Sequence, residues 1–374
     1  MILAVPQEHA SGERRVAVVP ESVKKLVKAG IDVVVQAGAG DAAAFHDDAY
    51  TAAGARIEPD VARLFADADF IVKVQPPIDN AAAGLHEATA MKSGAILLTT
   101  LAPLVNLDAV RALTAAGVTT FSTDLIPRIT RAQKMDTLSS MSTIAGYKAV
   151  LLAANATGKL FPMMMTAAGT LRPAGLQAIA TARRLGAVVE AFDVRPAAAE
   201  QIESLGATSL KVDAATEDAE TKGGYAREMS DAFKQKQEQL THDRCNANDV
   251  VITTALIFGK TAPTLITEAM VRSMRPGSVI VDLAAEMGGN CALTEPGATV
   301  VKHGVTIIGE RNLPATMPFH ASQMYSRNIT AFVLEFTKDG AFNVDMEDEI
   351  IAGAMVTRDG KVVNDLTRNA METK

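Results

Sequence analysis

The segment "GLQAIATARRLGAVVEAFD", residues Gly175–Asp193, has the order of elements that a nucleotide-binding domain places after its first strand. Apolar residues recur at helical spacing as far as Gly186, and glycine commonly follows the last turn of a helix. "AVVEAF" (Ala187–Phe192) then predicts a buried strand that ends on Asp193. In dinucleotide-binding folds, a carboxylate at this point accepts hydrogen bonds from the adenosine ribose. The segment therefore predicts the second half of such a unit.

The first half of this unit is missing from its expected place. A strand and a glycine-rich turn should precede the helix, because the turn supplies backbone N–H groups to the phosphates. The residues before Gly175 are "AAGTLRPA", which contain one proline and no apolar run. We therefore expect a nucleotide-binding domain that lacks its first strand and its glycine-rich turn.

The remaining sequence alternates between strand and helix patterns. Early predicted elements include strands at Ile2–Pro6, Phe70–Val74 and Ala95–Leu101, and a helix at Pro20–Gly30. Near the C-terminus, an Asp359-Gly360 turn predicts a hairpin. The pattern predicts an α/β protein with two Rossmann-like, doubly wound parallel-sheet domains and a cleft between them. We expect the first domain to comprise residues 1–137 and 320–374, and the second residues 138–319.

Composition and charge exclude several classes of protein. The formal net charge of the 374 residues is −7, and no Lys/Arg block is present, so a nucleic-acid surface is not expected. The two cysteines lie far apart, which argues against a disulfide framework and a zinc site. No apolar run approaches the ~20 residues of a membrane span. We expect a cytoplasmic chain without direct membrane insertion and without a metal.

One loop concentrates the polar residues of an otherwise apolar chain. We call "PRITRAQKMDTLSS", Pro127–Ser140, the polar loop. It follows a predicted strand, so it lies at the carboxyl edge of a sheet, where doubly wound folds bind ligands. It offers Arg128, Arg131, Gln133 and Asp136, which can hydrogen-bond an amide and a ribose. A solvated loop between domains is the alternative interpretation.

The second domain supplies further candidates. Asp193 can accept both ribose hydroxyls and repels a 2′-phosphate, which favours NAD(H) over NADP(H), although Arg195 lies close enough to weaken that rejection. A helix-capping role for Asp193 is the alternative. Gly224 and Tyr225 lie in a glycine-rich stretch that can fold over a cofactor, with an ordinary loop as the alternative. Leu256 follows a predicted strand at the same sheet edge and can cover a ring.

The chain resembles the NAD(H)-binding component of proton-translocating NAD(P) transhydrogenase, the first section of its alpha subunit, along nearly its whole length. The shared stretches include "GERRVAVVP", "PRITRAQKMD", "FPMMMTAAGT", "DVRPAA", "GGYAREM" and "DLAAEMGGNC". The resemblance implies that Arg128, Gln133 and Asp136 place the nicotinamide beside NADP(H) on a partner subunit. It also implies nucleotide contacts at Gln133, Lys134, Met135, Asp136, Ser139, Asp193, Val194, Arg195, Gly224, Tyr225, Gln237 and Leu256.

The resemblance carries expectations about chemistry and partners. It implies direct hydride transfer between NADH and NADP⁺, in which no side chain need act as an acid or a base. The implied partners are an NADP(H)-binding beta subunit and membrane-spanning subunits, with a homodimer of this chain. The implied location is the cytoplasmic side of the inner membrane, reached through those partners.

Two alternatives follow from departures within the sequence. Alanine dehydrogenase has the same two-domain plan, and its substrate site needs an Arg, a Lys and a His. Arg15 is present, but Gln75 and Ala102 stand at the other two positions, so this activity is disfavoured. Between Ala174 and Gly175 the family carries about ten residues of the kind "KVLVLGAGVA". Because both flanks match, an excision fits better than divergence, and a true deletion implies an inactive assembly subunit.

Overall fold

The computed structural model describes residues 1–159, 176–193, 196–210, 231–257 and 259–373. These residues form two compact units, Met1–Met141 with Pro314–Lys374, and Ser142–Leu313. Helix α6 (Thr137–Ala156) includes residues of both units. The fold class is that of an α/β protein with Rossmann-like units, as predicted.

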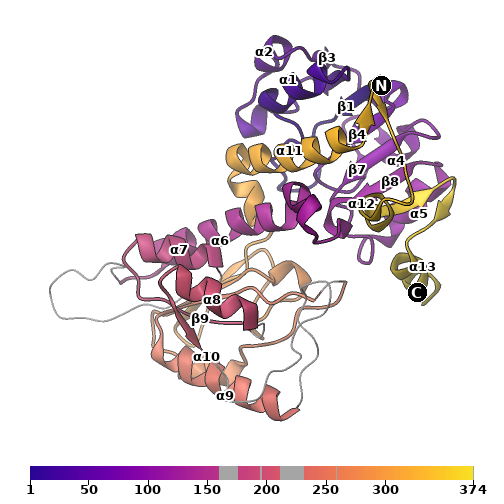
Figure 1. Cartoon of the computed structure of the whole chain (residues 1–374). Helices are drawn as coiled ribbons and strands as arrows, with labels where there is room; N and C mark the ends of the chain where they lie inside the picture. The colour runs from indigo at the N-terminus through magenta and orange to yellow at the C-terminus, as the bar shows by residue number, and fades with distance from the viewer. Residues whose placement is uncertain (160–175, 194–195, 211–230, 258, 374) are drawn as a thin grey trace. The chain divides into compact units, whose positions relative to one another are not determined.

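An eight-stranded sheet forms the first unit (Figure 1). Six neighbouring strands, β8, β7, β4, β1, β2 and β3, are parallel. The C-terminal hairpin, β17 and β18, adds two antiparallel strands beside β8. The strand order is β18 (Lys361–Val362), β17 (Met355–Arg358), β8 (Thr119–Ser122), β7 (Ile96–Thr99), β4 (Phe70–Val72), β1 (Ile2–Val5), β2 (Asp32–Gln36) and β3 (Arg56–Glu58).

Helices cover both faces of this sheet, as a doubly wound fold requires. Along β1, Leu3 and Val5 belong to one apolar cluster and Ala4 belongs to another, so alternate side chains enter two cores. α1 (Pro20–Lys28) and α11 (Pro318–Glu335) pack on the first face. α3 (Val61–Asp67) and α5 (Leu107–Ala115) pack on the second. The other helices of the unit are α2 (Asp47–Ala52), α4 (Glu87–Ala90), α12 (Glu349–Ala354) and α13 (Asp365–Thr373).

The predicted C-terminal hairpin is confirmed. β17 pairs antiparallel with β18, with Thr357 opposite Val362 and Arg358 opposite Lys361. Asp359 and Gly360 both have positive φ, at 50° and 69°, as the tight hairpin turn requires.

The second unit contains two separate sheets among its described residues. One pairs β10 (Thr208–Leu210) with β9 (Glu190–Phe192). The other has the order β11 (Val250–Thr253), β12 (Val279–Asp282), β14 (Val305–Ile308) and β13 (Thr299–Lys302). Its helices are α7 (Leu176–Arg184), α8 (Pro196–Ser204), α9 (Asp231–Ala247) and α10 (Glu268–Ser273).

Within the described ranges, no strand pairing joins these two sheets. The usual strand order of a Rossmann-like sheet is 3-2-1-4-5-6. The pair β10-β9 has the order of strands three and two, and β11-β12-β14 has the order of strands four to six. Ala191 of β9 and Ile252 of β11 still belong to one apolar core, so the two sheets pack together without pairing.

Candidate functional site

The polar loop follows the carboxyl end of β8 in the first unit. Its middle forms a 3₁₀ helix, η3 (Thr130–Met135), and Asp136 leads directly into α6. A pocket of about 300 Å³ opens on this loop. It is lined by Ile126, Pro127, Arg128, Ile129, Thr130, Ala132, Gln133 and Asp136. The structure therefore brings Arg128, Gln133 and Asp136 to one pocket.

Two apolar side chains of the polar loop anchor it in the core of the first unit. Ala132 and Met135 are buried in the main core of the unit, whereas Gln133 and Lys134 between them are exposed. The tight turn of a 3₁₀ helix separates these two sets onto different faces. The Met135 side chain is therefore covered by the core, whereas Gln133 is exposed and lines the pocket.

Asp136 also caps helix α6. Its Oδ1 accepts a hydrogen bond of 2.8 Å from the backbone N–H of Ser139, and its Oδ2 accepts one of 2.5 Å from the Ser139 hydroxyl. The bond from the backbone N–H is that of an N-cap residue, and the bond from the hydroxyl adds a second restraint. The bonds fix the orientation of the carboxylate, and its remaining lone pairs can accept a bond from a ligand.

Arg131 does not join the pocket residues. Its guanidinium donates two hydrogen bonds of 2.6 and 2.7 Å to Asp348, just before α12. Of the four polar side chains that the sequence offered for ligand binding, Arg131 is the one that does not line this pocket.

A buried charged cluster, Glu8, Glu13, Arg15, Lys73 and Glu87, lies at the same sheet edge. Lys73, which is 0% exposed, contacts Glu8 and Glu87 at 3.1 Å each. Arg15 contacts Glu13 at 2.6 Å. Three carboxyl groups therefore face two cations in the cluster, which leaves excess negative charge away from water.

This excess perturbs the protonation of the cluster. Burial raises the pKa of Glu8 above 4.5, and Glu13 and Glu87 act in the same direction, against the lowering effect of Lys73. Burial alone would lower the pKa of Lys73, but Glu8 and Glu87 outweigh it and keep the ammonium charged. The cluster thus makes Glu8 easier to protonate than a free glutamate, while Lys73 stays cationic.

The sign of this shift gives a pH prediction for Glu8→Gln. A carboxyl whose pKa is raised by folding destabilises the folded state as the pH rises above its ordinary value of 4.5. The substitution removes that ionisation, so the melting temperature of the variant relative to the parent should increase between pH 5 and pH 8. The difference should be smallest near pH 5, where the Glu8 carboxyl is most readily protonated in the parent, and should grow as the pH rises. Calorimetry checks it, with exposed Glu347→Gln as the control; a constant difference across pH would contradict it.

Arg15 and Gln75, which stand at two of the three positions of the alanine dehydrogenase substrate site, both hydrogen-bond the carboxylate of Glu13. Arg15 donates from Nε and Nη2 to Glu13 at 2.8 and 2.6 Å, and Gln75 donates to Glu13 at 2.8 Å. Ala102, at the third position, has no side chain that can exchange a proton. The arrangement satisfies Arg15 internally and offers no acid or base at the other two positions.

In the second unit, Asp193 directly follows β9, as the sequence predicted. Gln237 lies half-buried on α9, and Leu256 follows β11 with 55% of its surface exposed. The candidates Val194, Arg195, Gly224 and Tyr225 lie outside the described residues, as do Ala174 and Gly175.

A hydrogen-bond network that the sequence did not reveal fixes the loops after β11 and β12. Asp282 accepts bonds from the backbone N–H groups of Asn290 and Cys291, at 2.7 and 3.0 Å. Asn290, which is fully buried, exchanges two bonds of 2.9 Å with the backbone of Ala255, the neighbour of Leu256. Gly289 has φ +85°, and a Cβ there would lie 2.7 Å from the Asp282 carboxylate. Glycine at this position of "EMGGN" is thus required by the close approach.

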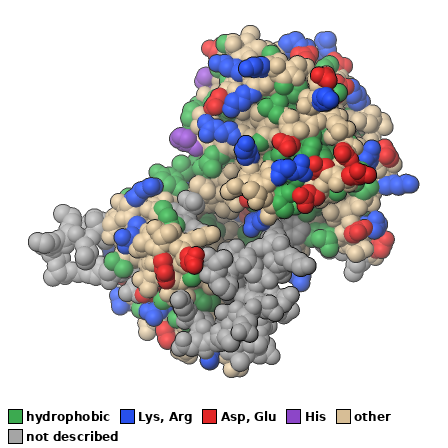
Figure 2. Space-filling view, in the orientation of Figure 1, with side chains coloured by type: hydrophobic (Ala, Val, Ile, Leu, Met, Phe, Trp, Pro, Cys, Tyr) green, Lys and Arg blue, Asp and Glu red, His purple; other side chains and the backbone are tan. Residues whose placement is uncertain are grey.

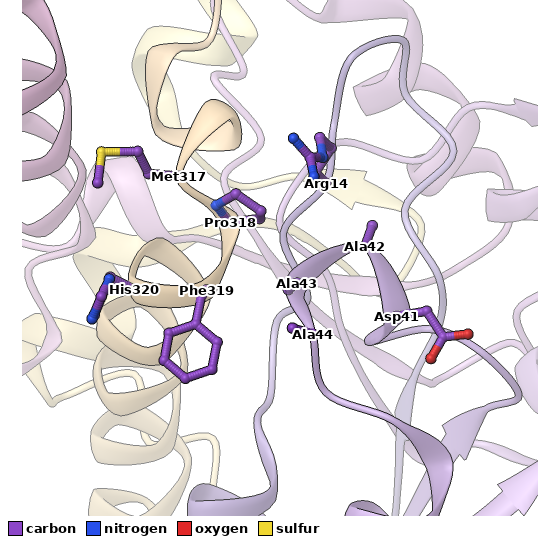
Figure 3. Close-up of a pocket in the computed structure, with 9 residues that line it drawn as sticks. All are labelled: Arg14, Asp41, Ala42, Ala43, Ala44, Met317, Pro318, Phe319 and His320. Carbon is purple, nitrogen blue, oxygen red and sulfur yellow. The ribbon is translucent and has the colours of Figure 1, made fainter. Parts of the chain in front are cut away.

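The first unit has a second pocket, of about 320 Å³, which none of the predicted site residues lines. Arg14 and residues 41–44 form one wall, and the start of α11 forms the other (Figure 3). Phe319 in the second wall stacks on Phe45, with 4.8 Å between the ring centroids.

On the face shown in Figure 2, basic and acidic side chains are interspersed over the first unit.

Neither a metal site nor a membrane span is present in the part of the chain that the structure describes. These residues contain no group of three His, Cys, Asp or Glu side chains that could hold a metal ion. Within the same ranges, every helix is too short or too polar to cross a membrane.

Comparison with known families identifies the chain. The model of the alanine dehydrogenase/PNT N-terminal domain matches residues 4–145, and that of the C-terminal domain matches residues 149–365. The chain belongs to the alanine dehydrogenase/PNT family. It is 49% identical to the first part of the NAD(P) transhydrogenase alpha subunit from Rhodospirillum rubrum, over 97% of this chain and 98% of that protein.

Two further relatives span the same length. A solved transhydrogenase from Sinorhizobium meliloti is 40% identical, with a TM-score of 0.82 over 98% of this chain and 100% of that one. Alanine dehydrogenase of Halomonas elongata is 31% identical, over 97% of this chain and 94% of that protein. The similarity to transhydrogenase subunits is greater, and the recognition made from the sequence motifs is confirmed.

Proposed function

We propose that this family member is the NAD(H)-binding component of a proton-translocating NAD(P) transhydrogenase. It transfers a hydride directly between NADH and NADP⁺ held by a partner subunit. The observation that carries the proposal is the pocket of the polar loop, which gathers a cation, an amide and a carboxylate at the carboxyl end of β8. The end-to-end similarity to transhydrogenase alpha subunits supports it.

The residues of the pocket have the chemistry that a nicotinamide nucleotide needs. The Gln133 amide can both donate to and accept from the nicotinamide carboxamide, and Asp136 can accept from a ribose hydroxyl. Arg128 supplies a charged donor, and Lys134, Met135 and Ser139 complete the proposed contacts. Hydride transfer is the chemistry of the cofactor, so these residues orient it and need not exchange a proton.

Cofactor choice rests on the second unit. Asp193 at the end of β9 is proposed to bind the adenosine ribose and to repel the 2′-phosphate of NADP(H). By family resemblance, Val194, Arg195, Gly224, Tyr225, Gln237 and Leu256 are proposed to enclose the nucleotide. The carboxylate of Asp193 favours NAD(H) on this chain, so NADP(H) is assigned to the partner.

The proposed assembly follows from that role. The partners are an NADP(H)-binding beta subunit and membrane-spanning subunits that couple hydride transfer to proton movement, with this chain as a homodimer. We place it on the cytoplasmic side of the inner membrane, attached through these partners.

Alanine dehydrogenase activity is the first alternative. An amino-acid substrate needs a free cation for its carboxylate and a group that takes its proton. Arg15 is engaged by Glu13, and Gln75 and Ala102 cannot act as a base. These contacts argue against that activity.

An assembly subunit that docks without binding NAD(H) is the second alternative. It is favoured by β9 and β11: within the described ranges, each of these strands pairs with a neighbour on one side only. The alignment with the Rhodospirillum protein runs over 377 residues, although this chain has 374. That relative therefore has residues with no counterpart here. A missing first strand would remove the backbone N–H groups that bind the pyrophosphate.

A titration with NADH and NADPH, followed by nicotinamide fluorescence up to millimolar concentration, tests the proposal. We expect weak, saturable NADH binding, with NADPH bound at least ~10-fold more weakly because Asp193 repels its phosphate. Equal binding of NADPH would overturn the cofactor assignment. Binding of neither nucleotide would favour the assembly subunit, and reduction of NAD⁺ by L-alanine would establish the dehydrogenase.

A further inference from the structure

The polar loop needs a rigid support if it is to present a nicotinamide. The apolar anchors Ala132 and Met135 fix its underside. These apolar side chains cannot hydrogen-bond the polar groups of the loop. The backbone carbonyl of Lys134 and the guanidinium of Arg131 therefore need partners from elsewhere in the unit. Two polar side chains from distant parts of the sequence meet this need, one on α11 and one at the start of α12.

Asn328 of α11 provides the first contact. It is 8% exposed, and its Nδ2 donates a hydrogen bond of 2.8 Å to the backbone carbonyl of Lys134, between Gln133 and Asp136. Its Oδ1 is buried and accepts no hydrogen bond from the described residues. A buried amide oxygen without a hydrogen bond costs folding free energy, and α11 nevertheless carries one at Asn328. The one hydrogen bond of this amide holds the polar loop.

Asp348 provides the second contact. Its carboxylate accepts both bonds from Arg131, at 2.6 and 2.7 Å, and also the backbone N–H of Ile350 at 2.8 Å, as the N-cap of α12. Arg131 therefore points toward α12, whereas Gln133 lines the pocket. Both bonds come from one nitrogen, Nη2, and these charge-assisted bonds hold the Arg131 guanidinium at the Asp348 carboxylate.

We propose that Asn328 and Asp348 are positioning residues for hydride transfer, which act through Lys134 and Arg131 to hold Gln133 and Asp136 in register with the nicotinamide. Neither residue lines the pocket. This inference rests on the proposed function for its catalytic meaning, but the support of the loop is a separate physical claim. A displacement near 1 Å can reduce a rate by up to ~100-fold without weakening binding.

Hydrogen exchange of the full chain without nucleotide tests the support. In Asn328→Ala, amide exchange in peptides covering residues 128–136 should accelerate at least ~10-fold, because the Lys134 carbonyl loses its partner. Asp348→Asn should give a smaller acceleration in the same peptides. The control is Arg327→Ala, next to Asn328 on α11, whose side chain contacts Glu21 of α1 at 3.3 Å instead of the loop.

A kinetic comparison tests the functional meaning. With the NADP(H)-binding subunit present, Asn328→Ala should slow hydride transfer about 10-fold at saturating NADH, with the NADH dissociation constant changed less than ~2-fold. Unchanged loop exchange, or equal acceleration in Arg327→Ala, would overturn the proposal. Faster loop exchange with an unchanged transfer rate would overturn its catalytic meaning. If the parent chain transfers no hydride while loop exchange responds as expected, the positioning stands and the proposed function fails.

Discussion

Insertion of "KVLVLGAGVA" between Ala174 and Gly175 should tighten NADH binding at least ~100-fold. Among the described residues, β9 and β11 each have an edge free to pair with the inserted strand, and their residues already share one core. The glycine-rich turn after it would direct backbone N–H groups at the pyrophosphate. Two such bonds to a charged group, at ~1.5 kcal/mol each, give about 3 kcal/mol, or ~100-fold in affinity.

Isothermal titration of the two chains with NADH measures this difference. The control is an insertion of ten Gly and Ser residues at the same position, which adds length but no apolar strand and should leave the affinity unchanged. Equal NADH affinity for the parent chain and the strand insertion would show that the chain binds the pyrophosphate without this element. The strand insertion should also raise the melting temperature of the second unit, because it pairs two sheet edges.

Replacement of Lys73 by Met should destabilise the first unit by about 3–5 kcal/mol, since loss of one partner leaves buried charges uncompensated. Lys73 is 0% exposed and contacts both Glu8 and Glu87. In the variant, the cluster keeps three carboxyl groups with Arg15 as its one cation. At ~2–4 °C per kcal/mol, the melting temperature should fall by about 6–20 °C at pH 7.

The pH dependence of that loss distinguishes charge from packing. The pKa of Glu8 is already raised by burial, and removal of Lys73 takes away the cation that lowers it. The destabilisation should therefore be smaller at pH 5, where the carboxyl is more readily protonated, and grow as the pH rises. Lys92→Met is the control, because Lys92 pairs with Asp69 at the surface and should cost less than ~1 kcal/mol. A loss in Lys73→Met that is independent of pH would assign the effect to packing.

Local patterns were sufficient to predict much of the fold. The apolar runs predicted β1, β4 and β7, and the Asp-Gly turn predicted the β17–β18 hairpin. The place of the polar loop followed from its position after a strand, because carboxyl ends of parallel strands meet at one edge. By contrast, β13 carries an alternation of exposed and half-buried residues and was not predicted.

Features that depend on contacts between distant residues could not be predicted. Glu8, Lys73 and Glu87 each stand alone in the sequence, and only the sheet brings them together. Asn328 reaches Lys134 across 194 positions, and Asn290 reaches Ala255 across 35. The direction of Arg131 was not evident either, because it depends on the 3₁₀ turn and on Asp348.

Hydride transfer in the presence of the NADP(H)-binding subunit tests the central claim most directly. Purified chain, parent or strand-restored, is mixed with that subunit, NADH and NADP⁺, and formation of NADPH is followed. The proposed role predicts transfer that requires both proteins, is faster with the strand-restored chain, and falls when Gln133 is replaced by Ala. If the strand-restored chain binds both NADH and the partner subunit and no NADPH forms, the chain is not the hydride-transferring component.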